Sequence, residues 1–403
     1  MENFKIGVLR EGKVPPDFRV PLTPKQCRFI KDSYPFVDVV VQPSSIRKFD
    51  NQSYVDAGIV LQEDLSDCDL IMGVKEVQIN DLIPNKKFMF FSHTIKKQSY
   101  NRSLLKSIID NKIQLIDYEV LKNRVGKRLI GFGRYAGIVG CYNGFRAFGL
   151  KHQLYILKKA CECKDRAELN EELKKVVLPK NTKIVATGFG RVGFGAREIL
   201  NLLPIVEVAP NEFSNSFDSP IFTHLEVNDY FAHVSGSEFD KRLFYEDSSQ
   251  YKSVFNSFAK QADMYIACHF WSSKSPFILT QEDLATNERL KVVADISCDI
   301  AGPIACTIRP SSISNPVYGF DPVSKQEVDF MRKDAVAVMA VDNLPCELPM
   351  DASEDFGNDF ISYVLPNFFN GDPDKTIERG SETNLNGELM PLFEYLNDYL
   401  SDN

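Results

Sequence analysis

The chain has 403 residues, of which 44% are hydrophobic and 25% are charged, and its formal net charge is −8. This length predicts two domains, and the composition is typical of a soluble globular protein. The negative charge argues against a nucleic-acid or anionic-membrane partner, and no apolar run reaches the ~18 residues that a membrane span needs.

The N-terminus and the cysteines together indicate the cellular compartment. The N-terminus lacks the basic start and apolar stretch of a signal peptide and is typical of a first strand. The nine cysteines are scattered along the chain. Cys161 and Cys163 stand too close together for the usual zinc pairing. We therefore expect reduced thiols, a cytoplasmic protein and no metal centre.

The first 161 residues alternate strand-like and helix-like segments, which favours an α/β fold. The predicted strands are Lys5–Leu9, Val37–Val41, Leu70–Val74, Phe88–Phe91 and Gln114–Tyr118. The predicted helices are Pro24–Asp32, Gln98–Asn111 and a long one, Gly137–Cys161, that could bridge two domains. The charged residues 162–180 follow as a predicted linker.

The most informative stretch is residues 183–196, where an apolar run leads into Gly188-x-Gly190-x-x-Gly193 and then into a helix-like segment. A strand, a tight turn and a helix in this order are the dinucleotide-binding pattern. Glycine is needed because a Cβ would block the turn and the approach of backbone N–H groups to the pyrophosphate. The helix N-terminus adds partial positive charge. We expect these glycines, with Arg191 and Val192, to bind a dinucleotide.

Beyond this loop the sequence predicts more strands of a doubly wound parallel sheet and a C-terminal tail that packs on the first domain. The strands are Ile205–Ala209, Met264–Cys268, Val292–Ile296 and Val336–Val341, with a long irregular excursion over residues 211–260, and the tail helices are Asp351–Asn370 and Leu385–Leu400. The prediction is two Rossmann-like domains with parallel sheets and an active site in the interdomain cleft. Residues 1–136 and 346–403 would form the substrate domain, and residues 137–345 the dinucleotide-binding domain.

Polar residues at the ends of these predicted strands are the candidates for chemistry. Lys75 and His93 end two successive strands, so a parallel sheet would bring them together. Burial would lower the pKa of the lysine, and two like charges would titrate as a coupled pair. A core histidine and a snorkelling lysine are the alternative. Arg19 could hold a carboxylate through two hydrogen bonds or form a surface ion pair. Asp299 and Asp342 could contact the cofactor or cap helices.

Short segments spread over residues 5 to about 370 resemble the saccharopine branch of the alanine dehydrogenase, transhydrogenase and saccharopine dehydrogenase superfamily, and they occur in family order. They are Gly7–Glu11, Arg19–Pro24, Leu61–Leu65, Met72–Glu76, Phe90–Lys96, Leu115–Glu119, Ala136–Gly137, Asp295–Asp299, Val341–Pro349 and Ala352–Gly357. The chain is similar both to the lysine–2-oxoglutarate reductase half of the bifunctional lysine-degrading enzyme and to the fungal lysine-forming saccharopine dehydrogenases. The spacing of the glycines resembles the fungal form more.

The resemblance implies a reversible reaction in which L-lysine, 2-oxoglutarate and reduced nicotinamide cofactor give saccharopine and water. It implies that Lys75 and His93 are the acid–base pair. The residues that it assigns to substrate are Arg19, Gln98, Glu119 and Phe132, and those that it assigns to cofactor are Lys127 and Asp342, with Asn343 and Leu344 beside the last. Arg134 departs from the family pattern and could bind an additional carboxylate.

The choice between NAD and NADP depends on the residues after the glycine loop. A ribose-binding acid is expected about 20 residues past the first glycine. Glu207 lies 19 residues past Gly188, and Glu212 is a second candidate. No lysine or arginine stands between Arg197 and Lys241, so a 2′-phosphate would find no local cation. These features favour NAD, whereas the resemblance to the reductase half favours NADP.

Two other functions compete with this interpretation. One is an alanine dehydrogenase-like enzyme that uses free ammonia, and the segments Leu115–Glu119 and Val341–Pro349 disfavour it. The other is a non-catalytic NAD-binding sensor, which would need neither Lys75 nor His93. The expected partners are the small-molecule substrates, and the sequence does not indicate an oligomeric state.

Overall fold

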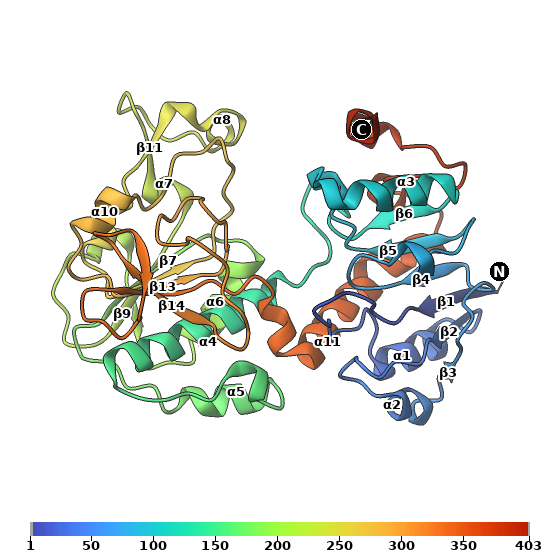
Figure 1. Cartoon of the computed structure of the whole chain (residues 1–403), viewed down its shortest axis with the longest axis horizontal. Helices are drawn as coiled ribbons and strands as arrows, with labels where there is room; N and C mark the ends of the chain where they lie inside the picture. The colour runs from blue at the N-terminus through green and yellow to red at the C-terminus, as the bar shows by residue number, and fades with distance from the viewer. Residues whose placement is uncertain (1–2, 402–403) are drawn as a thin grey trace. The chain divides into compact units, whose positions relative to one another are not determined.

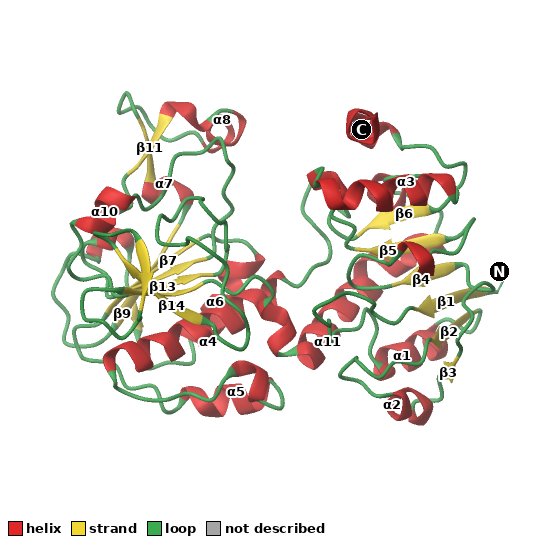
Figure 2. Cartoon of the chain, viewed as in Figure 1, coloured by secondary structure: helices red, strands yellow, loops and turns green. Residues whose placement is uncertain are grey.

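The computed structural model describes residues 3–401 and divides into two compact units (Figure 1). Unit 1 comprises the chain up to Phe132 together with the chain from Pro349 onward, and unit 2 is Gly133–Leu348. Figure 2 shows that each unit contains a sheet flanked by helices. The predicted two-domain α/β fold with parallel sheets is confirmed.

Unit 1 is built on six parallel strands in the order β3-β2-β1-β4-β5-β6. They are β1 (Phe4–Val8), β2 (Val37–Val41), β3 (Val60–Leu61), β4 (Leu70–Met72), β5 (Lys87–Phe90) and β6 (Gln114–Asp117). The order reverses between β1 and β4, and ligands of doubly wound sheets bind outside the carboxyl ends of the strands at such a reversal. We therefore expect the binding site of unit 1 among the residues that follow β1, β4 and β5.

Helices from both ends of the chain cover this sheet. They are α1 (Pro24–Ser33), α2 (Asn51–Asp56), α3 (Arg102–Asp110), α11 (Pro349–Asp359), α12 (Thr376–Gly380) and α13 (Asn397–Ser401). Thr23 caps α1 by accepting a hydrogen bond from the backbone N–H of Gln26. Phe356 and Phe360 are fully buried in the core of unit 1, so the amphipathic tail packs on the first sheet, as its apolar pattern predicted.

Unit 2 contains an eight-stranded sheet in the order β15-β14-β16-β13-β12-β7-β9-β8. The strands are β7 (Lys183–Thr187), β8 (Val206–Glu207), β9 (Ile221–Leu225), β12 (Met264–Ala267), β13 (Val292–Asp295), β14 (Val317–Asp321), β15 (Gln326–Val328) and β16 (Val336–Met339). Six of them are parallel, whereas β14 and β15 pair antiparallel at one edge. A hairpin of β10 (Phe231–His233) and β11 (Tyr251–Ser253) stands apart from this sheet.

The helices of unit 2 are α4 (Gly133–His152), α5 (Arg166–Leu173), α6 (Arg191–Leu200), α7 (Val227–Tyr230), α8 (Lys241–Glu246), α9 (Asn256–Ala259) and α10 (Gln281–Ala285). Two of them meet backbone to backbone. A Cβ on Gly137 of α4 would lie 1.9 Å from the carbonyl oxygen of Val192, and a Cβ on Gly195 of α6 would lie 1.9 Å from that of Arg134. These glycines hold α6, the helix after the glycine loop, tightly against α4.

One helix prediction and one linker prediction in the middle of the chain are wrong. The predicted helix Gly137–Cys161 ends at His152, because Gln153 takes a left-handed conformation (φ 54°) and the N–H of Leu154 bonds back to Gly149. The predicted linker over residues 162–180 contains α5, which Asp165 caps and whose Leu169 and Leu173 are buried in unit 2. The helix was not predicted because most of its residues are polar or charged and only Leu169 and Leu173 mark its buried face.

The excursion predicted over residues 211–260 contains the strand β9, which lies directly beside β7. All five of its residues, Ile221–Leu225, are buried, but two are the polar Thr223 and His224, so no apolar run marks the strand. The predicted strand Ile205–Ala209 shrinks to two exposed residues at the outer edge, β8. The tail helix predicted for Leu385–Leu400 is a 3₁₀ helix, Pro391–Leu396, followed by α13.

Candidate active site

Three neighbouring strands of unit 1 each place a titratable residue three positions beyond their last residue. Glu11 follows β1, Lys75 follows β4 and His93 follows β5. Because these strands are parallel and adjacent, the three residues stand along one edge of the sheet, at and beside the reversal of strand order. The sequence predicted this edge for Lys75 and His93 and overlooked Glu11.

Glu11 joins the loops that follow β1 and β4. Its carboxylate accepts hydrogen bonds from the backbone N–H groups of Val74 (2.6 Å) and Lys75 (2.9 Å). Burial raises its pKa to about 7 even though these bonds favour the charged form. Glu11 therefore holds the backbone of Lys75 in place at the carboxyl edge.

Lys75 has the environment of a usable base. Its side chain is half-buried, and within residues 3–401 its ammonium group forms no hydrogen bond or ion pair. Burial lowers its pKa first, and the positive charge of Arg19 lowers it further. The predicted coupling to His93 is wrong in this respect, since the like charge that depresses the pKa belongs to Arg19.

His93 is fixed in an unusual conformation. Its backbone is left-handed (φ 54°), and its Nδ1 donates a hydrogen bond of 2.6 Å to Glu76 Oε1. Glu76 Oε2 accepts a second hydrogen bond of 2.7 Å from the ammonium of Lys13. Burial opposes ionisation of Glu76, but the bonds from His93 and Lys13 prevail and lower its pKa to about 2. An ionised Glu76 therefore orients the His93 ring and leaves Nε2 for proton transfer.

Arg19 lies in a buried ion pair, and the alternative of a surface ion pair is wrong. Its guanidinium is 3% exposed and donates from Nε (2.9 Å) and from NH2 (2.5 Å) to the two oxygens of Asp17. It also stands 4.1 Å above the ring of Phe132, which stacks on Phe356 at 4.6 Å. Burial opposes ionisation of Asp17, but the charge and hydrogen bonds of Arg19 hold the pKa of Asp17 well below its usual value.

We expect Asp17→Ala to destabilise the protein strongly, because it leaves the Arg19 charge buried without its carboxylate. Breaking a buried pair from one side typically costs about 3–5 kcal/mol. Asp32→Ala is the matched control, since it removes an ion pair with Arg28 that is exposed to solvent and therefore contributes little to stability. Urea unfolding of both variants measures the difference, and equal midpoints would contradict the assigned role of the buried pair.

The other residues predicted to contact substrate lie in different surroundings. Glu119 is half-buried with Oε1 3.5 Å from Lys96 and 3.6 Å from Arg128, and its Oε2 is buried with no hydrogen-bond partner in the described structure. Gln98 is exposed and accepts from the hydroxyl of Tyr100.

Two further predicted contacts, Lys127 and Arg134, lie in different units. Lys127 is exposed in the turn between Lys122 and Arg128. Arg134 belongs to unit 2, where it donates to Glu198 at 2.6 and 3.1 Å. Its role as an extra substrate anchor stays a prediction.

The glycine loop has the geometry that its sequence predicted. Gly188 follows β7 with φ 93°, and α6 starts after Gly190. A Cβ on Gly193 would lie 1.8 Å from the carbonyl oxygen of Gly188, so the turn itself requires glycine there. His224 stacks on Phe189 at 4.0 Å and donates from Nε2 to the Gly188 carbonyl at 2.7 Å. These contacts hold the turn at the N-terminus of α6.

Gly190 provides a test of whether this loop fits a dinucleotide. A Cβ at this position would meet no heavy atom of residues 3–401 within 4 Å, and the backbone is extended (φ −85°), so the protein itself does not require glycine here. The missing side chain leaves open space at the helix N-terminus, where a phosphate binds. A pocket of about 480 Å³ adjoins this point, and its wall includes Gly190, Arg191 and Val192.

Glu226, an acid that the sequence did not single out, stands at the end of the strand next to β7. Glu226 follows β9, the neighbour of β7, and lines the glycine-loop pocket. Glu207 lies on the outer strand and pairs with Arg197, and Glu212 is bonded to the N–H of Ala209. The count along the sequence reaches β8, the next strand in the chain, whereas β9 takes the place beside β7, so Glu226 rather than Glu207 lines the glycine-loop pocket. The sequence signal that could have found Glu226 is an acid directly after a strand, here β9.

The same pocket contains groups of both charges and a buried histidine. Lys241 of α8 lines it, contrary to the expectation from the sequence that no cation is near. His269 follows β12 beside β7; burial lowers its pKa to about 3, so the ring is neutral. Its Nδ1 lies 3.0 Å from the hydroxyl of Thr187, whereas its Nε2 is buried with no partner among the described residues.

The remaining cofactor candidates stand at the ends of β13 and β16, which are adjacent. Asp299 is half-buried, and burial together with the charge of Asp295 raises its pKa to about 6. Asp342 is exposed, Asn343 is half-buried, and Leu344 is buried at the start of a 3₁₀ helix, Leu344–Glu347. All belong to the carboxyl edge of the unit 2 sheet, on which the glycine loop also lies.

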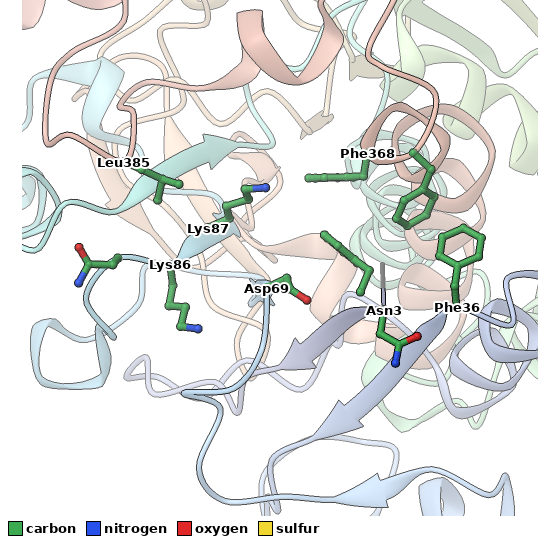
Figure 3. A pocket seen from close by; sticks show the side chains of 10 residues that line it. Asn3, Phe36, Asp69, Lys86, Lys87, Phe368 and Leu385 are labelled. Carbon is green, nitrogen blue, oxygen red and sulfur yellow. The ribbon is translucent and has the colours of Figure 1, made fainter. Parts of the chain in front are cut away.

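Another pocket, of about 470 Å³, lies at the opposite edge of the unit 1 sheet (Figure 3). Lys86, Lys87 and Asp69 line it where β4 and β5 begin, together with Phe36 and Phe368. It is therefore remote from the residues that follow the strands. Within residues 3–401, no cluster of His, Cys, Asp and Glu could hold a metal ion, and no helix is long and apolar enough to cross a membrane.

Both units have the doubly wound α/β arrangement: one places a glycine turn on a helix N-terminus, and the other gathers Glu11, Lys75 and His93 at the carboxyl edge of its sheet. The chain belongs to the alanine dehydrogenase/PNT family: the family's N-terminal domain matches residues 7–139, and its C-terminal domain matches residues 136–380.

Several curated proteins are similar to the chain. An alpha-aminoadipic semialdehyde synthase of Arabidopsis thaliana is 30% identical over 98% of this chain and 41% of its own length, and the mitochondrial one of Bos taurus is 29% identical over 86% and 42%. The chain thus spans about two fifths of these relatives. A saccharopine dehydrogenase (NAD(+), L-lysine-forming) of Schizosaccharomyces pombe is 24% identical over 89% of this chain and 91% of its own length.

Solved structures share the fold at lower identity. An L-alanine dehydrogenase superposes with a TM-score of 0.67 over 99% of this chain and all of its own, at 18% identity. A transhydrogenase from Sinorhizobium meliloti superposes with a TM-score of 0.59 over 96% of this chain and all of its own, at 14% identity. These likenesses concern the arrangement of the strands and helices.

Proposed function

We propose that this chain is a saccharopine dehydrogenase of the L-lysine-forming kind. It interconverts saccharopine, NAD⁺ and water with L-lysine, 2-oxoglutarate and NADH. The observation that carries the proposal is the edge formed by Glu11, Lys75 and His93, because it combines a lysine of lowered pKa with an oriented imidazole. The names of the relatives supply the substrate class.

The chemistry of this reaction matches the residues at the edge. In the direction of saccharopine formation, the ε-amine of lysine loses a proton and attacks the keto carbon, and the carbinolamine then loses water to give an imine. The cofactor, when bound, supplies the hydride that adds to the imine carbon. Lys75 and His93 accept and return the protons of these steps. Arg19 lies beside Lys75 and contributes positive charge toward a substrate that carries three carboxylates.

An assay of substrate pairs tests the proposal. We expect NADH oxidation with L-lysine plus 2-oxoglutarate and none above background with pyruvate plus ammonia. Replacing lysine by ornithine, which is one methylene shorter, tests the choice of amine. Turnover with pyruvate and ammonia, and none with lysine, would instead support the alanine dehydrogenase-like alternative. Absence of turnover with every pair, together with NADH binding, would support the sensor.

Glu226 is proposed as the residue that sets the preference for NADH. A carboxylate there accepts a hydrogen bond from the ribose 2′-hydroxyl of NADH and repels the 2′-phosphate of NADPH. Lys241, which lines the same pocket, would attract that 2′-phosphate. We expect Glu226→Gln to raise the ratio of NADPH to NADH efficiency at least tenfold, about 1.4 kcal/mol, and a further Lys241→Ala change to reverse that gain. Glu207→Gln is the control, because Glu207 pairs with Arg197. An unchanged ratio in Glu226→Gln would exclude this role.

Three parts of the sequence analysis stay predictions. They are the location of the reaction between the two units, the assignment of the substrate and cofactor domains to residues 1–136 with 346–403 and to 137–345, and the cytoplasmic location. Three of the relatives carry the word mitochondrial in their names, so fractionation of cells that express the protein is the direct measurement of its compartment.

A further inference from the structure

Two buried carboxyl groups of unit 1 are joined by a chain of hydroxyls that passes on both sides of His93. Asp117 ends β6, and Glu382 comes from the C-terminal segment, whose Ser381 bridges to Ile116 of the same strand. Ser92 and Thr94, the two neighbours of His93, lie between these acids. All four side chains are buried. We call Asp117, Ser92, Thr94 and Glu382 the hydroxyl chain.

The contacts along the hydroxyl chain are short and successive. Ser92 Oγ lies 2.5 Å from Asp117 Oδ2 and 2.6 Å from Thr94 Oγ1, and Thr94 Oγ1 lies 2.5 Å from Glu382 Oε2. Each contact has the length of an O–H···O hydrogen bond to a charged or strongly polar group. Each link needs one hydrogen atom of its own.

Counting the hydrogen atoms shows that the two hydroxyls are not enough. Ser92 Oγ also lies 3.3 Å from Glu382 Oε1, so Ser92 and Thr94, with one hydroxyl proton each, have two protons for three short links and this longer contact. The third must come from a carboxyl group at one end. Asp117 also accepts the backbone N–H groups of Ser92 (2.9 Å) and Glu119 (2.6 Å), which stabilise a carboxylate. Glu382 accepts no backbone N–H bond among the described contacts of its side chain, so the proton belongs on Glu382 Oε2.

We infer that Glu382 is a neutral carboxylic acid that, through Thr94, Ser92 and the Asp117 carboxylate, positions His93. In this arrangement Glu382 donates to Thr94, Thr94 donates to Ser92, and Ser92 donates to Asp117. The inference rests on the proposed role of His93. The hydroxyl chain holds the residues before and after His93, and so stabilises the left-handed backbone that directs the ring toward Glu76.

The electrostatic surroundings agree with this proton count. Burial raises the pKa of Glu382 well above its usual value, and the negative charge of Asp117 raises it further. The other titratable groups that face the pair are Glu119, whose charge acts on Asp117, and Tyr395 of the 3₁₀ helix Pro391–Leu396, on which both acids act. A second negative charge among them would be unfavourable, which favours the protonated form of Glu382.

Infrared spectroscopy of the full chain at neutral pH tests the protonation without any substrate. The difference spectrum of wild type minus Glu382→Gln should contain the carbonyl band of a protonated carboxylic acid, shifted in D2O. Glu388→Gln, an exposed position of the same segment that pairs with Asn384, should leave that band unchanged. A difference spectrum with only carboxylate bands would overturn the inference.

Kinetics and the His93 ring resonances test the positioning. Glu382→Gln keeps a donor toward Thr94, so we expect kcat within about threefold of wild type. Glu382→Ala and Thr94→Val break the chain; we expect at least a tenfold lower kcat, displaced His93 resonances and unchanged NADH affinity. A Gln variant as impaired as the Ala variant, or an Ala variant like wild type, would overturn the role. An inactive wild type that shows the acid band would refute the proposed function alone.

Discussion

The double variant Lys75→Met, His93→Gln is expected to lose nearly all turnover with lysine and 2-oxoglutarate. One positioned acid–base group typically contributes about 10²–10⁴-fold to the rate. Lys75 supplies a proton acceptor whose pKa burial has lowered, and His93 supplies an imidazole that Glu76 orients. Steady-state kinetics should therefore show a kcat at least about 10²-fold below wild type.

The same variant should still bind NADH with wild-type affinity, since the glycine loop belongs to unit 2. Lys86→Met, His233→Gln is the matched control: Lys86 lines the pocket at the opposite edge of the unit 1 sheet, and His233 is a half-buried residue of β10 in unit 2 that does not line the glycine-loop pocket. Turnover of the catalytic variant equal to that of this control would remove Lys75 and His93 from the proposed mechanism.

Gly190→Ala and Gly193→Ala are expected to fail in different ways, although both add one methyl group to the glycine loop. In Gly190→Ala the methyl group would enter open space, so the protein should keep its thermal stability and lose at least tenfold in NADH affinity, about 1.4 kcal/mol. In Gly193→Ala the methyl group meets the Gly188 carbonyl at 1.8 Å. Such overpacking typically costs about 1–3 kcal/mol or more.

Thermal unfolding and titration with NADH, monitored by fluorescence, separate these two outcomes. Gly190→Ala should unfold at the wild-type temperature with weakened binding, and Gly193→Ala should unfold at a lower temperature. If Gly190→Ala bound NADH as tightly as wild type, the phosphates would not lie at the N-terminus of α6, and the glycine-loop pocket would need another ligand.

Glu207 and Glu226 show how far a count along the sequence can go. The rule that places the acid about 20 residues past the first glycine assumes that the next strand in the chain is the neighbour of the first. Here the next strand is the exposed edge strand β8, and the neighbour of β7 is β9. Because β9 contains buried Thr223 and His224, its apolar signal is too weak to find from sequence.

Arg19 shows a different limit. Its place after the first strand was predictable, but its ion pair was not. Asp17 is only two residues away, yet the sequence does not show that Phe132 packs over the guanidinium and that both side chains are buried. The neighbours of Lys75 illustrate the same point. A strand end predicted a lysine at the edge, whereas the charge that lowers its pKa comes from Arg19, more than 50 residues earlier in the chain.

The amino-acid order alone determined the features that are local in the chain: the glycine turn before α6, the strands that end near Lys75 and His93, and the apolar stripe that buries Phe356. Hydrophobic periodicity and backbone conformation encode such features within a few residues. Only the tertiary structure decided that Glu226 and not Glu207 lines the glycine-loop pocket. It also decided that Ser92 and Thr94, the neighbours of His93, connect Glu382 to Asp117. Strand order and proton placement depend on burial and on contacts between residues hundreds of positions apart, which no local pattern records.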